Sequence, residues 1–204
     1  QAAAYETPEA LRAFLKILAN SLKLNGSAKL AGGRLRRLMR GVQIFGFHLA
    51  PIDLRQNSEV HARSVAELLA GAGRCPDYEA LPEAERIKLL VSEIATPRPL
   101  YSPYLNYSEE TRGELAIFFA ARELRQRYGA AALPNCIISK TDGVSDLLEL
   151  ALLLKESGLL LPGAQPQLNV NIIPLFETIE DLQKSAATMA GVFAIPAYRE
   201  LIAG

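Results

Sequence analysis

The sequence predicts a helix-rich α/β fold with three parallel strands, which together form a portion of a larger fold. Three apolar, strand-like segments, at residues 42–54, 136–139 and 168–176, are each followed by polar residues and then by a helix start. This order is typical of β-α units in a parallel sheet. Three parallel strands cannot close a barrel and would leave unpaired edges, which indicates that the larger fold holds more strands.

Composition and charge exclude several classes of protein. The chain has 204 residues, of which 50% are hydrophobic, so it can bury a sizeable core and is not a disordered chain. It contains 22 Lys and Arg against 22 Asp and Glu, and this balance creates no global field that would favour nucleic acid or an anionic membrane. The longest apolar candidate for a membrane span, residues 147–161, is interrupted by charged residues.

The N-terminus and the cysteines bear on processing and compartment. Gln1 is not an initiator Met, and the first residues lack the basic start and apolar run of a signal peptide. We therefore interpret the chain as a processed product or an excised piece. Cys75 and Cys136 lie far apart without metal-ligand spacing, so a reduced, intracellular protein is the simplest interpretation, and a single disulfide between them is the unsupported alternative.

Residues 1–41 are expected to form N-terminal helices. The first begins at Thr7, with Pro8 in its first turn, and ends near Asn25. The second, over about residues 30–40, forms either an anion-binding surface or a solvated helix face. We favour the solvated face, because the helix has an ordinary buried side and no interleaved aromatic residues. Its four arginines are Arg34, Arg36, Arg37 and Arg40.

Residues 42–58 are expected to form the first strand and its turn. The almost continuous apolarity of residues 42–54 suits a strand that is buried on both faces. Ser58 is a good N-cap for the helix that follows, which we expect to run through Ala70.

Residues 59–134 are interpreted as a helical insertion, which is longer than a plain β-α-β crossover. Within it, one helix begins at Pro82 and is closed by Pro97. Ser108 caps a longer helix that ends near Gly129.

Residues 135–204 are expected to supply two further β-α units. The first joins the strand at 136–139 to a helix at 146–157, and a linker follows. The second joins the strand at 168–176 to a helix over about residues 179–193. We interpret the whole chain as a single partial domain.

Glu177 is the main candidate for a metal ligand. It directly follows the third strand, and Thr178 with Asp181 forms a pattern close to a capping box. A carboxylate at a strand end is the usual position of a catalytic group in a parallel barrel. Mg²⁺ takes only one or two protein carboxylates. The alternative, a surface glutamate that stabilises the next helix N-terminus, is equally open.

Arg55 lies between a strand end and a helix start, where a guanidinium can clamp a phosphate or carboxylate. The alternative is a salt bridge to Asp53 or Glu59, which the residues alone slightly favour. Lys140, at the second strand end, is more simply a surface or ion-pair lysine than a Schiff-base former. His61 is expected to be exposed or paired with Glu59.

Three stretches of the chain resemble signatures of the phosphoenolpyruvate carboxylase family, in matching order and approximate spacing. The first is FGFHLAPIDLRQNS at residues 45–58. The second runs from ISKT at 138–141 into SDLLE at 145–149, and the third is PLFETIEDL at 174–182. The resemblance extends over nearly the whole chain.

The resemblance implies a fold, a reaction and two site residues. The fold is a parallel (β/α)8 barrel of the TIM type with helical insertions, of which this chain supplies early strands. The reaction converts phosphoenolpyruvate and bicarbonate to oxaloacetate and phosphate, with Mg²⁺ or Mn²⁺, in a cytoplasmic, allosteric homotetramer that replenishes the tricarboxylic acid cycle. Glu177 matches the family's metal-ligand glutamate. Arg55 matches its catalytic, substrate-binding arginine.

Other motifs of the family are absent from the sequence. These are the second metal carboxylate in a GYSDS motif, the histidine of a TAHPT-like motif and the GRGG loop. We therefore expect a fragment of the enzyme that is inactive by itself. The alternative is a non-catalytic binding or assembly module that retains the carboxylase scaffold. Neither interpretation involves nucleic acid or a membrane.

Overall fold

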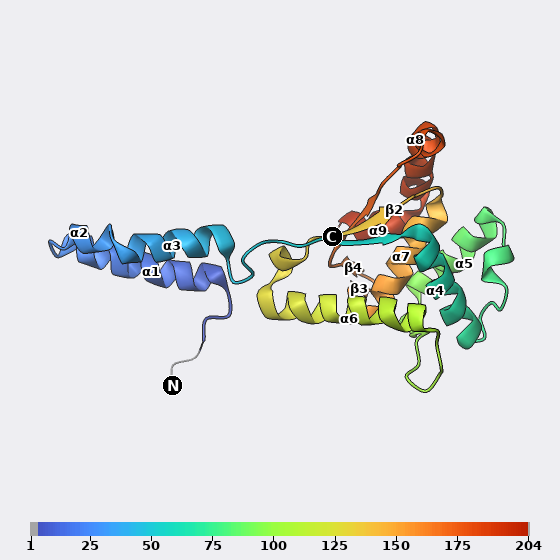
Figure 1. Cartoon of the computed structure of the whole chain (residues 1–204), viewed down its shortest axis with the longest axis horizontal. Coiled ribbons are helices and arrows are strands. Elements are labelled where there is room, and N and C mark those ends of the chain that lie inside the picture. The colour runs from blue at the N-terminus through green and yellow to red at the C-terminus, as the bar shows by residue number, and fades with distance from the viewer. Residues whose placement is uncertain (1–3, 204) are drawn as a thin grey trace. The chain divides into compact units, whose positions relative to one another are not determined.

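The computed structural model describes residues 4–203 and shows two compact units (Figure 1). The N-terminal unit contains residues up to 51 together with 125–132. The sheet unit contains residues 52–124 and the residues from 133 onward. No helix within residues 4–203 is both long enough and apolar enough to cross a bilayer.

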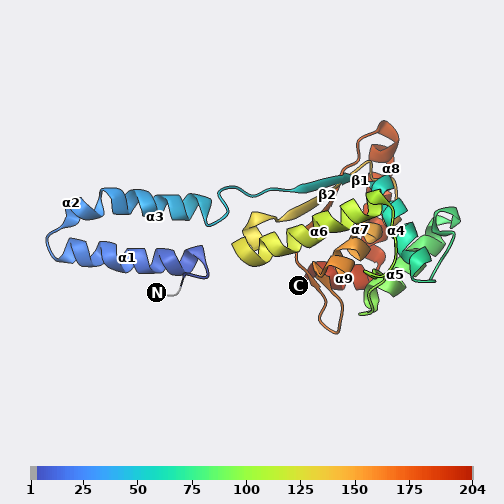
Figure 2. The ribbon, with the colours of Figure 1, turned by 60° about the horizontal axis from the view of Figure 1, so that its bottom comes forward.

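The N-terminal unit is dominated by a helical hairpin (Figure 2). Helix α1 (Pro8–Leu24) packs beside α3 (Arg34–Phe45), and the short α2 (Ala28–Ala31) lies at the turn between them. The Thr7 hydroxyl accepts a hydrogen bond from the amide of Ala10 at 3.1 Å, which confirms the predicted helix start.

The strand predicted over residues 42–54 is wrong for most of its length. Residues 42–45 are the end of α3, and strand β1 covers only Leu54–Asn57. An apolar run of this kind fits the buried side of a helix as well as a strand. Gly46, at φ +53°, ends the helix in a conformation that favours glycine.

Three parallel strands form the sheet in the order β1-β2-β5, which confirms the predicted α/β class. Strand β2 is Asn135–Ser139 and β5 is Asn171–Pro174. The third strand is therefore shorter than the predicted 168–176. Its first predicted residue, Leu168, instead belongs to β4 (Gln167–Leu168), which pairs antiparallel with β3 (Leu160–Leu161) in the predicted linker.

The helices of the insertion and of the later β-α units begin and end close to the predicted positions. One difference is the cap of α4, where the Asn57 side chain, and not Ser58, accepts from the amide of Glu59 at 3.1 Å. The elements are α4 (Ser58–Gly71), η1 (Tyr78–Ala80), α5 (Glu83–Ala95), α6 (Glu109–Tyr128), η2 (Ala130–Ala132), α7 (Val144–Ser157), α8 (Ile179–Ala194) and α9 (Pro196–Ala203).

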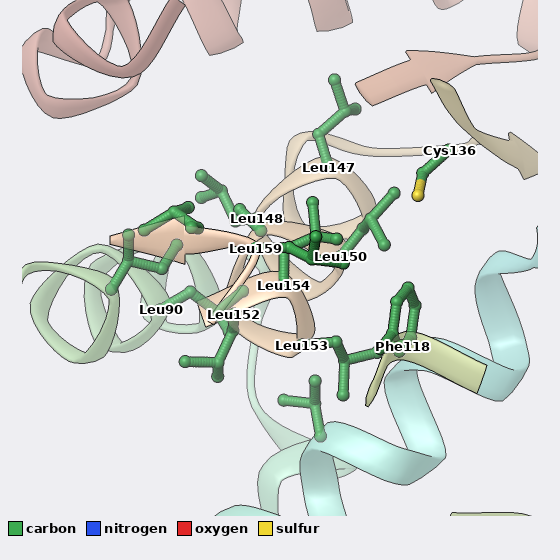
Figure 3. Close-up of a cluster of buried hydrophobic side chains, with 14 of the residues drawn as sticks. Leu90, Phe118, Cys136, Leu147, Leu148, Leu150, Leu152, Leu153, Leu154 and Leu159 are labelled. Atoms are coloured by element: carbon green, nitrogen blue, oxygen red, sulfur yellow. The ribbon is translucent and has the colours of Figure 1, made fainter. Parts of the chain in front are cut away.

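Helix α7 forms the centre of the hydrophobic core (Figure 3). Every residue from 147 to 157 is buried, and α7 packs against α4, α5 and the strands. Each fully buried leucine contributes roughly 1.5–3 kcal/mol through the hydrophobic effect. The core therefore covers one face of the sheet, through Cys136 and Ile138, and leaves the other face for polar groups.

Candidate functional site at the carboxyl ends of the strands

The carboxyl ends of the parallel strands bring both predicted site residues together. The Nη2 of Arg55 donates a hydrogen bond to Oε1 of Glu177 at 2.8 Å, and its Nε donates to Oγ of Ser139 at 2.7 Å. These three residues come from β1, from β2 and from the segment after β5. Because parallel strands end at one edge of the sheet, residues far apart in the chain meet there.

Lys140 contributes its main chain rather than its amine. Its N–H donates to Oε2 of Glu177 at 2.8 Å, and its carbonyl accepts from the hydroxyl of Ser58 at 2.8 Å. Lys140 has φ +54°, a left-handed conformation that costs roughly 1–2 kcal/mol for a residue with a side chain. Its Nζ lies 3.9 Å from Glu59, so the ion-pair interpretation of this lysine is confirmed.

Glu177 is positioned by main-chain pairing that continues past the end of β5. The amide of Leu175 donates to the carbonyl of Ile138 at 2.8 Å, and the amide of Thr141 donates to the carbonyl of Leu175 at 3.0 Å. Helix α8 begins directly after Glu177, with Thr178 as its N-cap. The carboxylate is therefore fixed between an extended ladder and a capped helix.

The site lies on the sheet face that α7 does not cover. Arg55 and Ile137 are opposite each other in the register, and Ile137 is opposite Ile173. Below this row, nearer the amino ends of the strands, the side-chain amide of Asn135 donates to Oδ1 of Asp53 at 2.9 Å, and the side-chain amide of Asn171 donates to Oδ1 of Asn135 at 3.0 Å. Asp53 thus accepts a hydrogen bond from Asn135. Arg55 forms its ion pair with Glu177, whereas the alternative interpretation predicted a salt bridge to Asp53 or Glu59.

The Arg55–Glu177 ion pair is open to solvent. The side chain of Arg55 is 57% exposed and that of Glu177 is 37% exposed. Pairs of this kind contribute about 0–1 kcal/mol to stability. The Arg55–Glu177 pair therefore contributes little to the stability of the fold. Its arrangement matters mainly for the ligands that the two charged groups can bind.

Glu177 could hold a hard cation, although the described residues offer it little further support. Within residues 4–203 there is no group of three or more His, Cys, Asp or Glu side chains placed to hold a metal ion. An ionised carboxylate has about four lone-pair positions, and the hydrogen bonds from Arg55 and Lys140 use two of them. The donor set fits Mg²⁺ or Mn²⁺, which need one or two protein carboxylates together with water and substrate oxygens.

A buried polar pair behind β1 was missed by sequence reasoning. His61 is only 1% exposed, and its Nε2 lies 3.4 Å from Oε1 of Glu114, so its predicted exposure is wrong. The other oxygen of Glu114 accepts from the Gln56 amide at 3.0 Å, beside a cavity of about 170 Å³. The sequence signal that could have revealed this pair is Glu114, an acidic residue among apolar neighbours on the buried side of α6, near Leu115 and Phe118.

Comparison with known proteins identifies the family. The family model described as phosphoenolpyruvate carboxylase matches residues 1–204. The chain belongs to the phosphoenolpyruvate carboxylase family. It is 64% identical to the phosphoenolpyruvate carboxylase of Aromatoleum aromaticum over 189 residues, which are 93% of this chain and 20% of that protein.

Two further carboxylases of the family show how similarity extends along the chain. The phosphoenolpyruvate carboxylase of Azoarcus sp. is 58% identical over 203 residues, which are 100% of this chain and 22% of that protein. That of Mycobacterium leprae is 50% identical over 200 residues, or 98% of this chain and 21% of that protein. The chain thus spans about a fifth of the length of these family members.

Proposed function

We propose that this chain is part of a phosphoenolpyruvate carboxylase, a lyase that fixes bicarbonate onto phosphoenolpyruvate to give oxaloacetate and phosphate. The observation that carries the proposal is a pair of hydrogen bonds at the carboxyl ends of three parallel strands. The Glu177 carboxylate accepts both, one from Arg55 and one from the main-chain amide of Lys140. Family membership over the whole chain supports the same reaction. In a parallel α/β barrel, this edge is where catalytic groups gather.

We assign the sheet to an eight-stranded barrel of the TIM type. The strands are parallel and neighbouring in chain order, helices cover one face, and the other face carries the site. In such a barrel the uncovered face would become the interior. The rows that contain Arg55 and Asn135 would then form successive inward-facing layers.

Each site residue has a separate task in this proposal. Glu177 would ligate Mg²⁺ or Mn²⁺, and the bound cation would supply positive charge that stabilises negative charge on substrate oxygens. The Arg55 guanidinium would bind a phosphate or carboxylate group in a bidentate manner. The Lys140 amide would hold the Glu177 carboxylate in a fixed orientation. Preorganised charges of this kind supply the largest single contribution in many enzymes.

The setting of the proposed enzyme follows the family. We place it in the cytoplasm as a homotetramer under allosteric control by metabolites, with phosphoenolpyruvate and bicarbonate as substrates. The balanced composition of the chain, with 22 basic and 22 acidic residues, gives no support to a nucleic-acid partner.

The test compares variants of the full-length protein that contains this chain. Wild type, Glu177→Gln and Arg55→Ala are assayed for oxaloacetate formation, with Mn²⁺ binding followed by electron paramagnetic resonance. We expect each change to lower kcat by about 10²–10³-fold, because each removes a charge that acts on the reacting groups. Glu177→Gln alone should weaken Mn²⁺ binding.

The matched control is Glu180→Gln, which removes an exposed carboxylate from the first turn of α8 without touching Arg55. It should leave turnover and Mn²⁺ binding unchanged. Activity that survives both site substitutions would remove Arg55 and Glu177 from the catalytic site. An inactive, folded full-length protein would favour the non-catalytic module.

A further inference from the structure

Ser58 carries a buried hydroxyl that does not cap the helix in which it lies. The Asn57 side chain caps α4 instead, and Ser58, the first residue of the helix, is only 6% exposed. Its Oγ donates a hydrogen bond to the carbonyl of Lys140 at 2.8 Å, across 82 positions of the chain. The hydroxyl therefore joins the start of α4 to the residue that follows β2.

Lys140 has a main-chain conformation that is unfavourable for a residue with a side chain. Its φ of +54° lies in the left-handed region. Among the residues other than glycine within 4–203, only Leu49, in the N-terminal unit, also has a positive φ. Such conformations persist where the surrounding contacts enforce them, and they gather at functional sites. The contacts of the Lys140 main chain therefore matter for its function.

Two hydrogen bonds hold the main chain of Lys140, one at each end of the residue. Its carbonyl accepts from Ser58, and its amide donates to Oε2 of Glu177 at 2.8 Å. A change of φ would rotate the carbonyl relative to the amide, so a relaxed Lys140 could not keep both bonds. The bond to Ser58 therefore helps to keep the amide directed at Glu177.

The side chain of Lys140 is not needed for this arrangement. It is 58% exposed, and its Nζ lies 3.9 Å from Oε1 of Glu59, whose side chain is 66% exposed. Exposed pairs of this kind add little stability. The Cβ atom makes the left-handed conformation less favourable, whereas glycine adopts that conformation without this penalty. A substitution here can therefore change the strain and keep the amide.

We propose that Ser58 is a positioning residue for the metal ligand Glu177 and acts through the strained main chain of Lys140. The Ser58 hydroxyl keeps Lys140 in its left-handed conformation. The Lys140 amide then orients the carboxylate whose remaining lone pairs would hold Mg²⁺ or Mn²⁺. Residues that orient a metal ligand commonly control metal affinity. The inference rests on the proposed role of Glu177 in metal binding.

The test compares variants of the full-length protein that contains this chain. Electron paramagnetic resonance measures the dissociation constant of Mn²⁺. Hydrogen exchange with mass spectrometry follows the peptide that contains the Lys140 amide in the metal-free protein. We expect Ser58→Ala to raise the Mn²⁺ dissociation constant about tenfold, because the Glu177 carboxylate loses its fixed orientation. The Lys140 amide should exchange faster in the same variant.

A second substitution distinguishes this role from a general loss of packing. In the Ser58→Ala background, Lys140→Gly should restore Mn²⁺ binding, because glycine keeps the left-handed conformation without support from the hydroxyl. Lys140→Ala should not restore it, because alanine retains the penalty. Both changes remove the amine and its pair with Glu59, so their difference reports the main-chain conformation. A protein that had lost its fold would not regain Mn²⁺ binding through glycine.

Ser64→Ala is the matched control for the loss of a buried hydroxyl from α4. Ser64 is 0% exposed, and its Oγ has no hydrogen-bond partner among the residues that the structure describes. This variant should leave Mn²⁺ binding and the exchange of the Lys140 amide unchanged. If it weakened Mn²⁺ binding as much as Ser58→Ala does, the effect would come from packing and the inference would be overturned.

Glu177→Gln separates failure of this inference from failure of the proposed function. If Glu177→Gln weakens Mn²⁺ binding and Ser58→Ala does not, Glu177 remains the ligand and only the role of Ser58 is overturned. The role of Ser58 is also overturned if glycine and alanine at position 140 give the same affinity in the Ser58→Ala background. If Glu177→Gln leaves Mn²⁺ binding unchanged, the metal-binding role of Glu177 fails, and this inference fails with it.

Discussion

Glu149 is an acid within the apolar core. It is fully buried in α7, and its Oε1 accepts a hydrogen bond from the hydroxyl of Tyr78 at 2.7 Å. Burial raises the pKa of Glu149 to about 7, against an ordinary 4.5, and the nearby Asp146 acts in the same direction. The Tyr78 bond and the Arg86 guanidinium oppose this shift but are weaker. Burial and the Glu149 charge also raise the pKa of Tyr78.

This pKa predicts how the stability of the chain varies with pH. Since the folded pKa of Glu149 is raised, the native state keeps a proton that the unfolded chain releases from about pH 4.5 upward. The resulting stabilisation is complete below that pH and is lost as the pH rises through about 7. The change is on the order of 3 kcal/mol. Glu149→Gln should remove this decline and leave the chain more stable than wild type at alkaline pH.

Urea unfolding of the 204-residue chain at a series of pH values would measure this effect. Glu109→Gln, which removes an exposed carboxylate from the start of α6, serves as the control for the change of charge. An unchanged pH slope in Glu149→Gln would show that Glu149 stays ionised in the folded state.

At the residue scale, sequence reasoning identified Arg55 and Glu177 but not their mutual pairing. The two are 122 positions apart, and only the register of three strands brings them to 2.8 Å. The amide of Lys140 could not be predicted, because its role depends on a left-handed main-chain conformation. The burial of His61 depends on helix α6 and was equally hidden.

Helix α8 illustrates how local sequence determines the start of an element. Thr178 Oγ1 accepts from the amide of Asp181 at 3.0 Å, and the Asp181 carboxylate accepts from the amide of Thr178 at 3.1 Å. These bonds satisfy two amides that the helix itself leaves unpaired. They form directly after Glu177, so the cap also limits motion of the candidate site.

Loss of this cap should loosen the first turn of α8. Thr178→Ala is expected to cost about 1 kcal/mol of stability, because the amide of Asp181 loses its acceptor. Hydrogen exchange of the first-turn amides measures the effect directly. Ser185→Ala, which removes a hydroxyl bonded to the carbonyl of Leu182 within the same helix, should leave those amides protected. Equal exchange in both variants would contradict a role for the cap.

At the element scale, the main error lies at residues 42–54. The apolar run there joins the end of α3 to an irregular segment, and only β1 remains as strand. Apolarity alone does not separate a buried helix end from a buried strand. Capped helices were predicted well, since proline, serine and glycine signals act through neighbouring residues. Strand β2 lies within one residue of the predicted 136–139, whereas β1 and β5 are shorter than predicted, since their limits depend on their partners.

At the scale of the whole molecule, the chain holds one strand-end carboxylate at its site. Within residues 4–203, no group of three or more His, Cys, Asp or Glu side chains is placed to hold a metal ion, so Glu177 belongs to no complete metal-binding group there. We therefore expect the isolated 204-residue chain to form no oxaloacetate and to bind Mn²⁺ weakly. The full-length protein, assayed under the same conditions, is the positive control. Turnover by the isolated chain would show that these residues hold a complete active site.

The sequence by itself determined the parallel β-α order and most helix starts, whereas Arg55 and Glu177 were singled out as candidate site residues by the family resemblance. The β-α order and the helix starts depend on local chemistry: capping side chains, the conformations of proline and glycine, and the change from apolar to polar residues at strand ends. Only the tertiary structure decided the strand limits, the Arg55–Glu177–Lys140 cluster and the raised pKa of Glu149. Register, burial and desolvation arise between segments that are distant in the chain, so no single stretch of sequence contains them.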